Sequence, residues 1–322
     1  MEGAAIARSP GHISGYFRRV AGKTPCETGS CGAGIVIAEG VMARAVPAPA
    51  PRVKIVSSSP LPGGAGFQSG GSPSTAGRSR LSPEGPQPPR TTTAPSDPWP
   101  PVEPGIPLIE TAMERLGVSA EVTTGSVLPA GAGFGLSAAA LLATLTALDR
   151  LSALRLAPHD IAALAHEAEV THRTGLGDVA ACQGGGFECR KGPGVGAEIL
   201  RIGGTGEVIR AVSFGPIPTP AILGDPGRME RVARAFPGRC PRDIRDFFAL
   251  SRAFATRSGL VTPRVGEVLA ACDRAGVPAS MTMLGEGVFA LGDEAGPVLA
   301  PYGKVFRLLV ADRGFTPAEV SR

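Results

Sequence analysis

The sequence contains little lysine and no long apolar run. Only four of its 32 basic residues are lysines, namely Lys23, Lys54, Lys191 and Lys304. Phosphate binding would therefore depend on backbone amides, arginine and metal, and a lysine-centred P-loop is disfavoured. The longest nearly apolar run, residues 138–148, contains two threonines and is too short to cross a bilayer. We therefore expect no membrane-spanning segment.

The six cysteines stand at spacings that fit neither a CxxC pair nor a zinc ribbon, so we expect a reduced cytoplasmic protein. The first residues do not combine a basic segment with an apolar core, and no secretory signal is expected. The net charge is +4, and the basic residues are scattered along the chain. Nucleic acid is therefore not an expected partner.

Glycine and proline, in contrast, are abundant, with 45 and 32 residues. Many of them lie between residues 47 and 105, in a segment rich in Pro, Ser, Gly and Thr with short apolar stretches such as Val53–Val56. Such a composition buries too little apolar surface to offset its ordering entropy. We expect a mostly irregular segment there, either a flexible insertion or a local replacement of ordinary sequence.

The rest of the chain mixes predicted strands and helices without a βαβ rhythm, which favours an α+β fold over a doubly wound sheet. Residues 9–46 resemble strand-and-turn material with glycine clusters at 11–15 and 29–34. Helices are expected near residues 108–116, 136–151, 159–173, 225–236, 241–257 and 263–275, and strands near 120–128, 179–190, 279–291 and 304–311.

A glycine loop opens directly into the alanine- and leucine-rich helix of residues 136–151. Gly131, Gly133 and Gly135 allow backbone amides to approach an anion, and the positive end of the helix dipole points to the same place. The pattern is neither GxxxxGK[ST] nor GxGxxG, so a Rossmann oxidoreductase is disfavoured. A purely structural turn is the alternative. Ser137 could cap the helix or bind a magnesium ion that bridges phosphates.

Two carboxylates follow this loop. Glu169 lies at the edge of the apolar stripe of its helix, as a metal ligand or as the partner of Arg173. Asp178 follows Gly175 and Gly177 on a tight turn, where it could be a turn residue or the partner of a hydroxyl nucleophile.

Five segments together resemble the GHMP kinases, and more closely their archaeal pantoate kinase branch. They are SPGHISGYF (9–17), GSCGAG (29–34), LPAGAGFGLSAAALL (128–142), HEAEVTHRTGLGDV (166–179) and ASMTMLGEGVFA (279–290), in the family's order. The resemblance implies a domain like ribosomal S5 domain 2, formed by residues 1–46 and 106–190, and a ferredoxin-like domain, residues 191–322. It also implies a homodimer that uses ATP and Mg²⁺ to phosphorylate the 4-hydroxyl of pantoate, a step towards coenzyme A.

The resemblance also implies roles for particular residues. ATP would be bound by Pro129, Gly131, Gly133, Gly135 and Ser137. The metal ion would be held by Ser137 and Glu169, and Asp178 would be the catalytic residue. The substrate would be bound by Arg190, His166 and Thr219.

One family position differs, because Cys31 stands in GSCGAG where an arginine is expected. Any substrate or phosphate contact at this position is therefore not expected. Two alternatives stay open, the second because of the unusual segment 47–105. The chain could be another small-alcohol GHMP kinase, acting on homoserine or mevalonate, or a catalytically silent nucleotide-binding protein.

Overall fold

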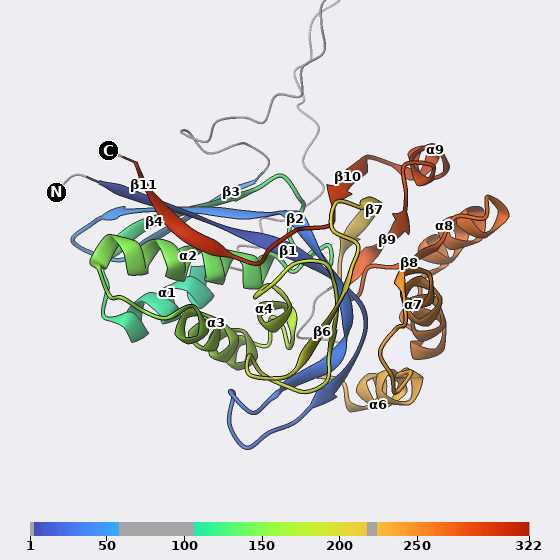
Figure 1. The fold of residues 1–322 in the computed structure, drawn as a ribbon, viewed down its shortest axis with the longest axis horizontal. Helices are drawn as coiled ribbons and strands as arrows, with labels where there is room; N and C mark the ends of the chain where they lie inside the picture. The colour runs from blue at the N-terminus through green and yellow to red at the C-terminus, as the bar shows by residue number, and fades with distance from the viewer. Residues whose placement is uncertain (1–2, 58–105, 218–223, 322) are drawn as a thin grey trace, which may run out of the picture.

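The computed structural model describes residues 3–57, 106–217 and 224–321. Two β-sheets lie side by side in it, and each is covered by its own group of helices (Figure 1). In the described residues one sheet has seven strands and the other four. This mixed arrangement agrees with the predicted α+β class.

The first sheet is built on a long antiparallel hairpin of β1 (Ala4–Val20) and β2 (Gly29–Pro47). Both glycine clusters of the predicted strand-and-turn region lie inside these strands. The register shifts between Ser9 and Gly11 and between Ser14 and Tyr16. Glycine allows a side chain to pack closely against the backbone here, because a Cβ atom on Gly34 would lie 2.1 Å from the ring Nε2 of His12.

Strand β3 (Arg52–Ser57) is a regular part of the segment 47–105, which was expected to be mostly irregular. It pairs in parallel with β4 (Ala120–Ser126), and β4 pairs antiparallel with β2. The apolar stretch noted at 53–56 therefore belongs to the sheet. Residues 58–105 lie outside the described residues.

Three further strands complete this sheet. Strand β5 (Phe187–Arg190) pairs with β2 and with β6 (Ile199–Gly203), and β11 (Thr316–Ser321) pairs with β1. The sheet therefore extends beyond the domain boundary expected at residue 190. In addition, the strand expected at 179–190 begins only at Phe187, and residues Asp178–Ala181 form the short helix α4 instead.

Helices α1 (Ile106–Leu116), α2 (Leu136–Ser152) and α3 (Pro158–His172) form the layer beside the first sheet (Figure 1). All three confirm the predicted helices. Helix α2 is buried along most of its length, from Ala138 to Leu148, because the sheet lies on one side of it and α1 and α3 pack elsewhere on it. Its alanine-rich sequence suits this crowded position.

The second sheet has the strand order β10-β7-β9-β8. Its strands are β7 (Val208–Pro216), β8 (Ala279–Met281), β9 (Gly285–Leu291) and β10 (Val305–Leu309). The surrounding helices are α6 (Pro226–Ala235), α7 (Ile244–Ser258), α8 (Pro263–Arg274) and the short α9 (Ala295–Leu299), followed by a 3₁₀ turn at Ala300–Tyr302. Phe247 of α7 packs against Phe187 of β5 and Phe289 of β9, so one aromatic cluster joins the two sheets.

A disulfide joins Cys189 of β5 to Cys240, which lies before α7. The expectation of a fully reduced protein is therefore wrong for this pair, while Cys26, Cys31, Cys182 and Cys272 are free thiols. The two bonded cysteines are 51 residues apart in sequence, which is why no spacing motif indicated them. The bond ties the strand that carries Glu188 and Arg190 to the helical side of the second sheet.

Replacing Cys240 by serine is expected to lower the free energy of unfolding by up to about 4 kcal/mol, because the unfolded chain loses a cross-link that closes a loop of this size. Urea denaturation without reductant measures this. Treatment of the unmodified protein with a phosphine reductant should lower the free energy of unfolding by the same amount. The control Cys26→Ser, at an exposed free thiol, should leave the free energy of unfolding unchanged. Equal stability of Cys240→Ser and the unmodified chain would contradict the expectation.

Candidate active site

The glycine loop joins β4 to α2. Gly131, Gly133 and Gly135 have φ values of 70°, 82° and 63°, a left-handed conformation that suits glycine. Helix α2 starts immediately after Gly135, which has no side chain to cap it. The first amides of α2 are therefore available to an anion, which the helix dipole also favours.

The glycine loop packs directly on residues 283–285, the MLG segment that leads from β8 into β9 of the second sheet. A Cβ atom on Gly133 would lie 2.9 Å from the carbonyl oxygen of Met283, and one on Gly285 only 2.1 Å from the carbonyl carbon of Ala132. These glycines allow two backbones to touch. Two sequence segments about 150 residues apart in the chain thus form one wall of the site.

Ser137 and Glu169 meet beside the loop. The Ser137 hydroxyl donates to Oε1 of Glu169 at 2.6 Å, and the Glu169 side chain is fully buried. Its Oε2 has no hydrogen-bond partner in the described residues. Burial, together with the charge of Asp178, raises the pKa of Glu169 to about 8. Gly175 makes room for this carboxylate, because a Cβ atom there would lie 2.5 Å from Oε2.

This oxygen pair fits a magnesium ion that is also bound by phosphates. In the described residues no three His, Cys, Asp or Glu side chains gather as a metal site. Mg²⁺ does not require such a cage, since it commonly takes one or two protein oxygens, phosphate oxygens and water. A buried carboxylate oxygen without a partner would be stabilised by such a cation.

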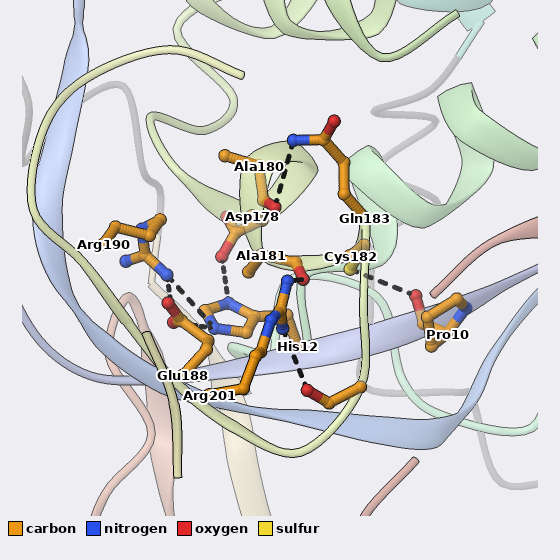
Figure 2. A network of polar contacts seen from close by, with 11 residues as sticks. Pro10, His12, Asp178, Ala180, Ala181, Cys182, Gln183, Glu188, Arg190 and Arg201 are labelled. Atoms are coloured by element: carbon orange, nitrogen blue, oxygen red, sulfur yellow. Dashed lines mark hydrogen bonds and ion pairs between the residues drawn. The ribbon is translucent and has the colours of Figure 1, made fainter. Parts of the chain in front are cut away.

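His12 of β1 lies at the centre of a chain of charged side chains (Figure 2). Its Nδ1 is 2.6 Å from Oδ1 of Asp178, and its Nε2 is 3.0 Å from Oε1 of Glu188. Burial lowers the pKa of His12, but the hydrogen bonds to the two carboxylates outweigh burial and raise that pKa overall. An imidazolium can donate to both partners at once. The backbone amide of His12 also donates to the carbonyl of Phe134, at 2.9 Å, so the chain is tied to the glycine loop.

Asp178 opens helix α4, and its side chain is 22% exposed. Burial raises the pKa of Asp178, yet its hydrogen bond and charge interaction with His12 outweigh burial and hold the pKa below its ordinary value. Asp178 is therefore ionised at neutral pH. An ionised, partly accessible carboxylate can accept a hydrogen bond from a substrate hydroxyl.

Arg190 lies beyond Glu188 in this chain. Its side chain is almost fully buried and forms an ion pair with Glu188 through Nη1, while its Nε has no partner in the described residues. A Cβ atom on Gly177 would lie 2.7 Å from this Nε and 2.5 Å from the hydroxyl oxygen of Ser30. Gly175 and Gly177, the two glycines of the TGLGD segment (174–178), thus make room for the charged side chains of Glu169 and Arg190. A guanidinium with a free donor suits a carboxylate ligand.

His166 lies in a different setting. Its Nε2 is 2.8 Å from the carbonyl oxygen of Thr28, and burial lowers its pKa, so the ring is neutral. It lines a cavity of about 510 Å³ between α3 and the loops that contain Cys26 and Gly194. Thr28 stands two residues before Ser30, which lies beside Gly177. Thr219 lies outside the described residues.

No role was predicted from the sequence for His12 or Glu188. His12 stands within SPGHISGYF, and Glu188 stands two residues before Arg190 in a strand, which places both side chains on one face. The proximity of Glu188 to Arg190 could have been predicted from the alternation of side chains along a strand. The role of His12 could not, because it depends on a contact with Asp178 across 166 residues of chain.

The sequence matches the family model described as GHMP kinases N terminal domain over residues 107–186. It is also 40% identical to a pantoate kinase of Methanospirillum hungatei over 305 residues, which cover 95% of this chain and 93% of that protein. The chain belongs to the pantoate kinase branch of the GHMP kinases. It is accordingly an ATP-dependent kinase with an alcohol group as acceptor.

One further relative and two solved structures are also similar to this chain. A pantoate kinase of Thermococcus kodakarensis is 34% identical over 180 residues, covering 51% of this chain and 56% of that protein. A solved structure described as a phosphotransferase related to the CoA biosynthesis pathway has a TM-score of 0.71 at 23% identity, with 99% of both chains covered. A homoserine kinase of Cytophaga hutchinsonii has a TM-score of 0.60 at 15% identity, covering 99% of this chain and 97% of that one. These two structures confirm the GHMP kinase fold.

Proposed function

We propose that this kinase transfers the γ-phosphoryl group of ATP to the 4-hydroxyl of (R)-pantoate, giving 4-phosphopantoate for coenzyme A biosynthesis. One observation carries the proposal: a buried arginine with an unused donor lies in the same chain of contacts as an ionised aspartate. This pairing suits an acceptor that has a carboxylate at one end and a hydroxyl at the other. The similarity to the Methanospirillum hungatei protein supports it.

In this proposal the nucleotide phosphates lie over the glycine loop. The amides of residues 131–135 and the start of α2 bind them, together with Pro129 as a loop residue, and Ser137 and Glu169 hold Mg²⁺. The ion would neutralise charge that develops on the transferred group. Because the loop amides are fixed before the nucleotide arrives, they need little reorganisation during the reaction.

The acceptor is oriented from the other side of the site. Arg190 binds the pantoate carboxylate, with His166 and Thr219 as further substrate contacts, and Asp178 accepts a hydrogen bond from the 4-hydroxyl. The hydroxyl oxygen then forms a bond to the γ-phosphorus in line, the bond from that phosphorus to the ADP oxygen breaks, and the hydroxyl proton leaves towards Asp178. His12 keeps Asp178 ionised and fixes its direction.

An acceptor panel tests this function. We expect ADP release that depends on both Mg²⁺ and (R)-pantoate, with kcat/KM for homoserine and mevalonate at least about 100-fold lower, since a site built for particular polar groups rejects acceptors that leave them unpaired. A coupled assay for ADP, with mass spectrometry of the product, measures it. Preference for homoserine or mevalonate would identify another small-alcohol kinase, and ATP binding without any turnover would indicate a silent nucleotide-binding protein.

Two broader expectations from the family resemblance remain proposals: a homodimer, and a cytoplasmic location. In the described residues no helix has the length and apolar character needed to cross a membrane. Light scattering coupled to size-exclusion chromatography tests the dimer. A mass close to the 32.7 kDa of one chain would contradict it.

A further inference from the structure

Glu188 lies between the two halves of the proposed site. Its Oε1 faces Nε2 of His12 at 3.0 Å and also pairs with Nη1 of Arg190. His12 in turn bonds Asp178 at 2.6 Å. One carboxylate oxygen therefore connects the arginine proposed for the acceptor carboxylate to the aspartate proposed for the acceptor hydroxyl (Figure 2).

The surroundings of Glu188 favour strong contacts. The side chains of His12 and Glu188 are 0% exposed, and that of Arg190 is 1% exposed. Water therefore does not compete for these bonds, and charged hydrogen bonds are stronger in such surroundings. Burial raises the pKa of Glu188, but Arg190 and His12 outweigh burial and hold it below its ordinary value. The carboxylate thus stays charged between two cations.

The four side chains come from three separate elements. His12 lies on β1, Glu188 and Arg190 on β5, and Asp178 on α4. β1 and β5 both pair with β2, and α4 precedes β5 in the chain. Within the described residues, Oε2 of Glu188 has no partner. Oε1 therefore makes both contacts of this carboxylate, and Nη1 of Arg190 also lies 3.5 Å from Nε2 of His12. A neutral side chain at position 188 could keep at most part of the two Oε1 contacts.

We propose that Glu188 is a positioning residue that fixes Arg190 for the acceptor carboxylate and, through His12, fixes Asp178 for the acceptor hydroxyl. The inference rests on the proposed function, since it needs an acceptor with both groups. By binding Nη1, Glu188 leaves Nε of Arg190 directed away from itself and towards Gly177 and Ser30. By binding Nε2 of His12, it turns Nδ1 towards Asp178.

The test is Glu188→Gln, which keeps the shape and removes the charge. We expect KM for pantoate to rise about tenfold and kcat to fall about tenfold, as for loss of hydrogen bonds between charged groups. KM for ATP should stay within about twofold, because the hydrogen bonds of this side chain in the described residues go to His12 and Arg190 and not to the glycine loop. Glu39→Gln is the matched control: Glu39 is a half-buried carboxylate on β2 that accepts the backbone amide of Leu309. It should change neither kcat nor KM.

Two double-mutant cycles separate the two connections. If Glu188 acts on the acceptor through Arg190, Glu188→Gln should have little further effect on KM for pantoate in an Arg190→Met background. If it acts on Asp178 through His12, it should have little further effect on kcat in a His12→Asn background. If Glu188 had a purely structural role, Glu188→Gln would lower the melting temperature. Its effects on KM and kcat would then multiply with those of Arg190→Met and of His12→Asn.

The outcomes are distinguishable. Unmodified protein that releases no ADP with pantoate overturns the proposed function itself. Active unmodified protein whose Glu188→Gln variant keeps the same kcat and KM overturns the role of Glu188, as do effects that multiply in both cycles. A folded variant with a raised KM, a lowered kcat and both cycles non-additive supports it.

Discussion

Asp178→Asn is expected to lower kcat by about 10²–10⁴-fold, the range for a positioned acid or base. Asparagine keeps the shape of the side chain but carries no charge, so it cannot hold the hydroxyl proton or stabilise it electrostatically. The variant should also weaken the His12 contact at the centre of the charged chain. ATP binding should change by about twofold or less, because in the proposed site the glycine loop and the start of α2 supply that binding.

Single-turnover measurements with saturating ATP and pantoate test this loss, and calorimetric titration of ATP tests the unchanged binding. Asp312→Asn is a suitable control, since Asp312 is exposed and pairs with its neighbour Arg313. Wild-type turnover in Asp178→Asn would show that the aspartate does not act on the acceptor. Loss of ATP affinity together with turnover would instead mean that Asp178 serves the nucleotide.

Glu169→Gln is expected to lower turnover by about 10²-fold or more, since a bound metal supplies several kcal/mol of charge stabilisation in the transition state. The glutamine cannot be ionised, so its amide oxygen and the Ser137 hydroxyl would both be charge-neutral ligands. Raising the Mg²⁺ concentration should recover part of the activity. A variant with unchanged Mg²⁺ dependence would contradict the assignment of Glu169 to the metal.

For Glu169 we also expect the stability of the folded protein to depend on pH with the opposite sign to that expected for an ordinary glutamate. Its pKa is raised from 4.5 to about 8 in the folded chain. Between these values the folded state keeps a proton that the unfolded state has released, so without Mg²⁺ stability should fall as the pH rises through this window. Mg²⁺ should displace this proton near pH 7.

Thermal unfolding at several pH values measures the first effect, and titration calorimetry of Mg²⁺ in buffers of different ionisation enthalpy measures the second. Glu169→Gln should abolish both. The lack of any proton release on Mg²⁺ binding to the unmodified protein would mean that Glu169 is already ionised when the metal arrives.

Much of the candidate site could be predicted, because the residues proposed for it lie in short segments. The glycine loop and Ser137 stand together in one motif, and Asp178 follows a glycine-bearing turn. The structure brings Ser137 to Glu169 and places Asp178 and Arg190 in one chain of contacts. The predicted helices were also confirmed, since their apolar periodicity is strong over ten residues or more.

The rest depended on contacts that a linear sequence does not show. His12 reaches Asp178 across 166 residues, and Cys189 reaches Cys240 across 51. The glycines of residues 11–15 and 29–34 lie in paired strands, where several make room for a neighbouring side chain or backbone that is distant in the sequence. Strand β3 was missed because six residues of ordinary strand sequence precede a long Pro- and Gly-rich stretch.

The pairing of β11 with β1 has a consequence for biosynthesis. Strand β1 ends at Val20, while its partner begins at Thr316, so nearly the whole intervening chain must leave the ribosome before this edge can close. Until then the outer backbone groups of β1 are open to pairing with another nascent copy, a known route to aggregation. We expect the yield of correctly folded protein to depend on translation speed and on chaperones that shield this edge.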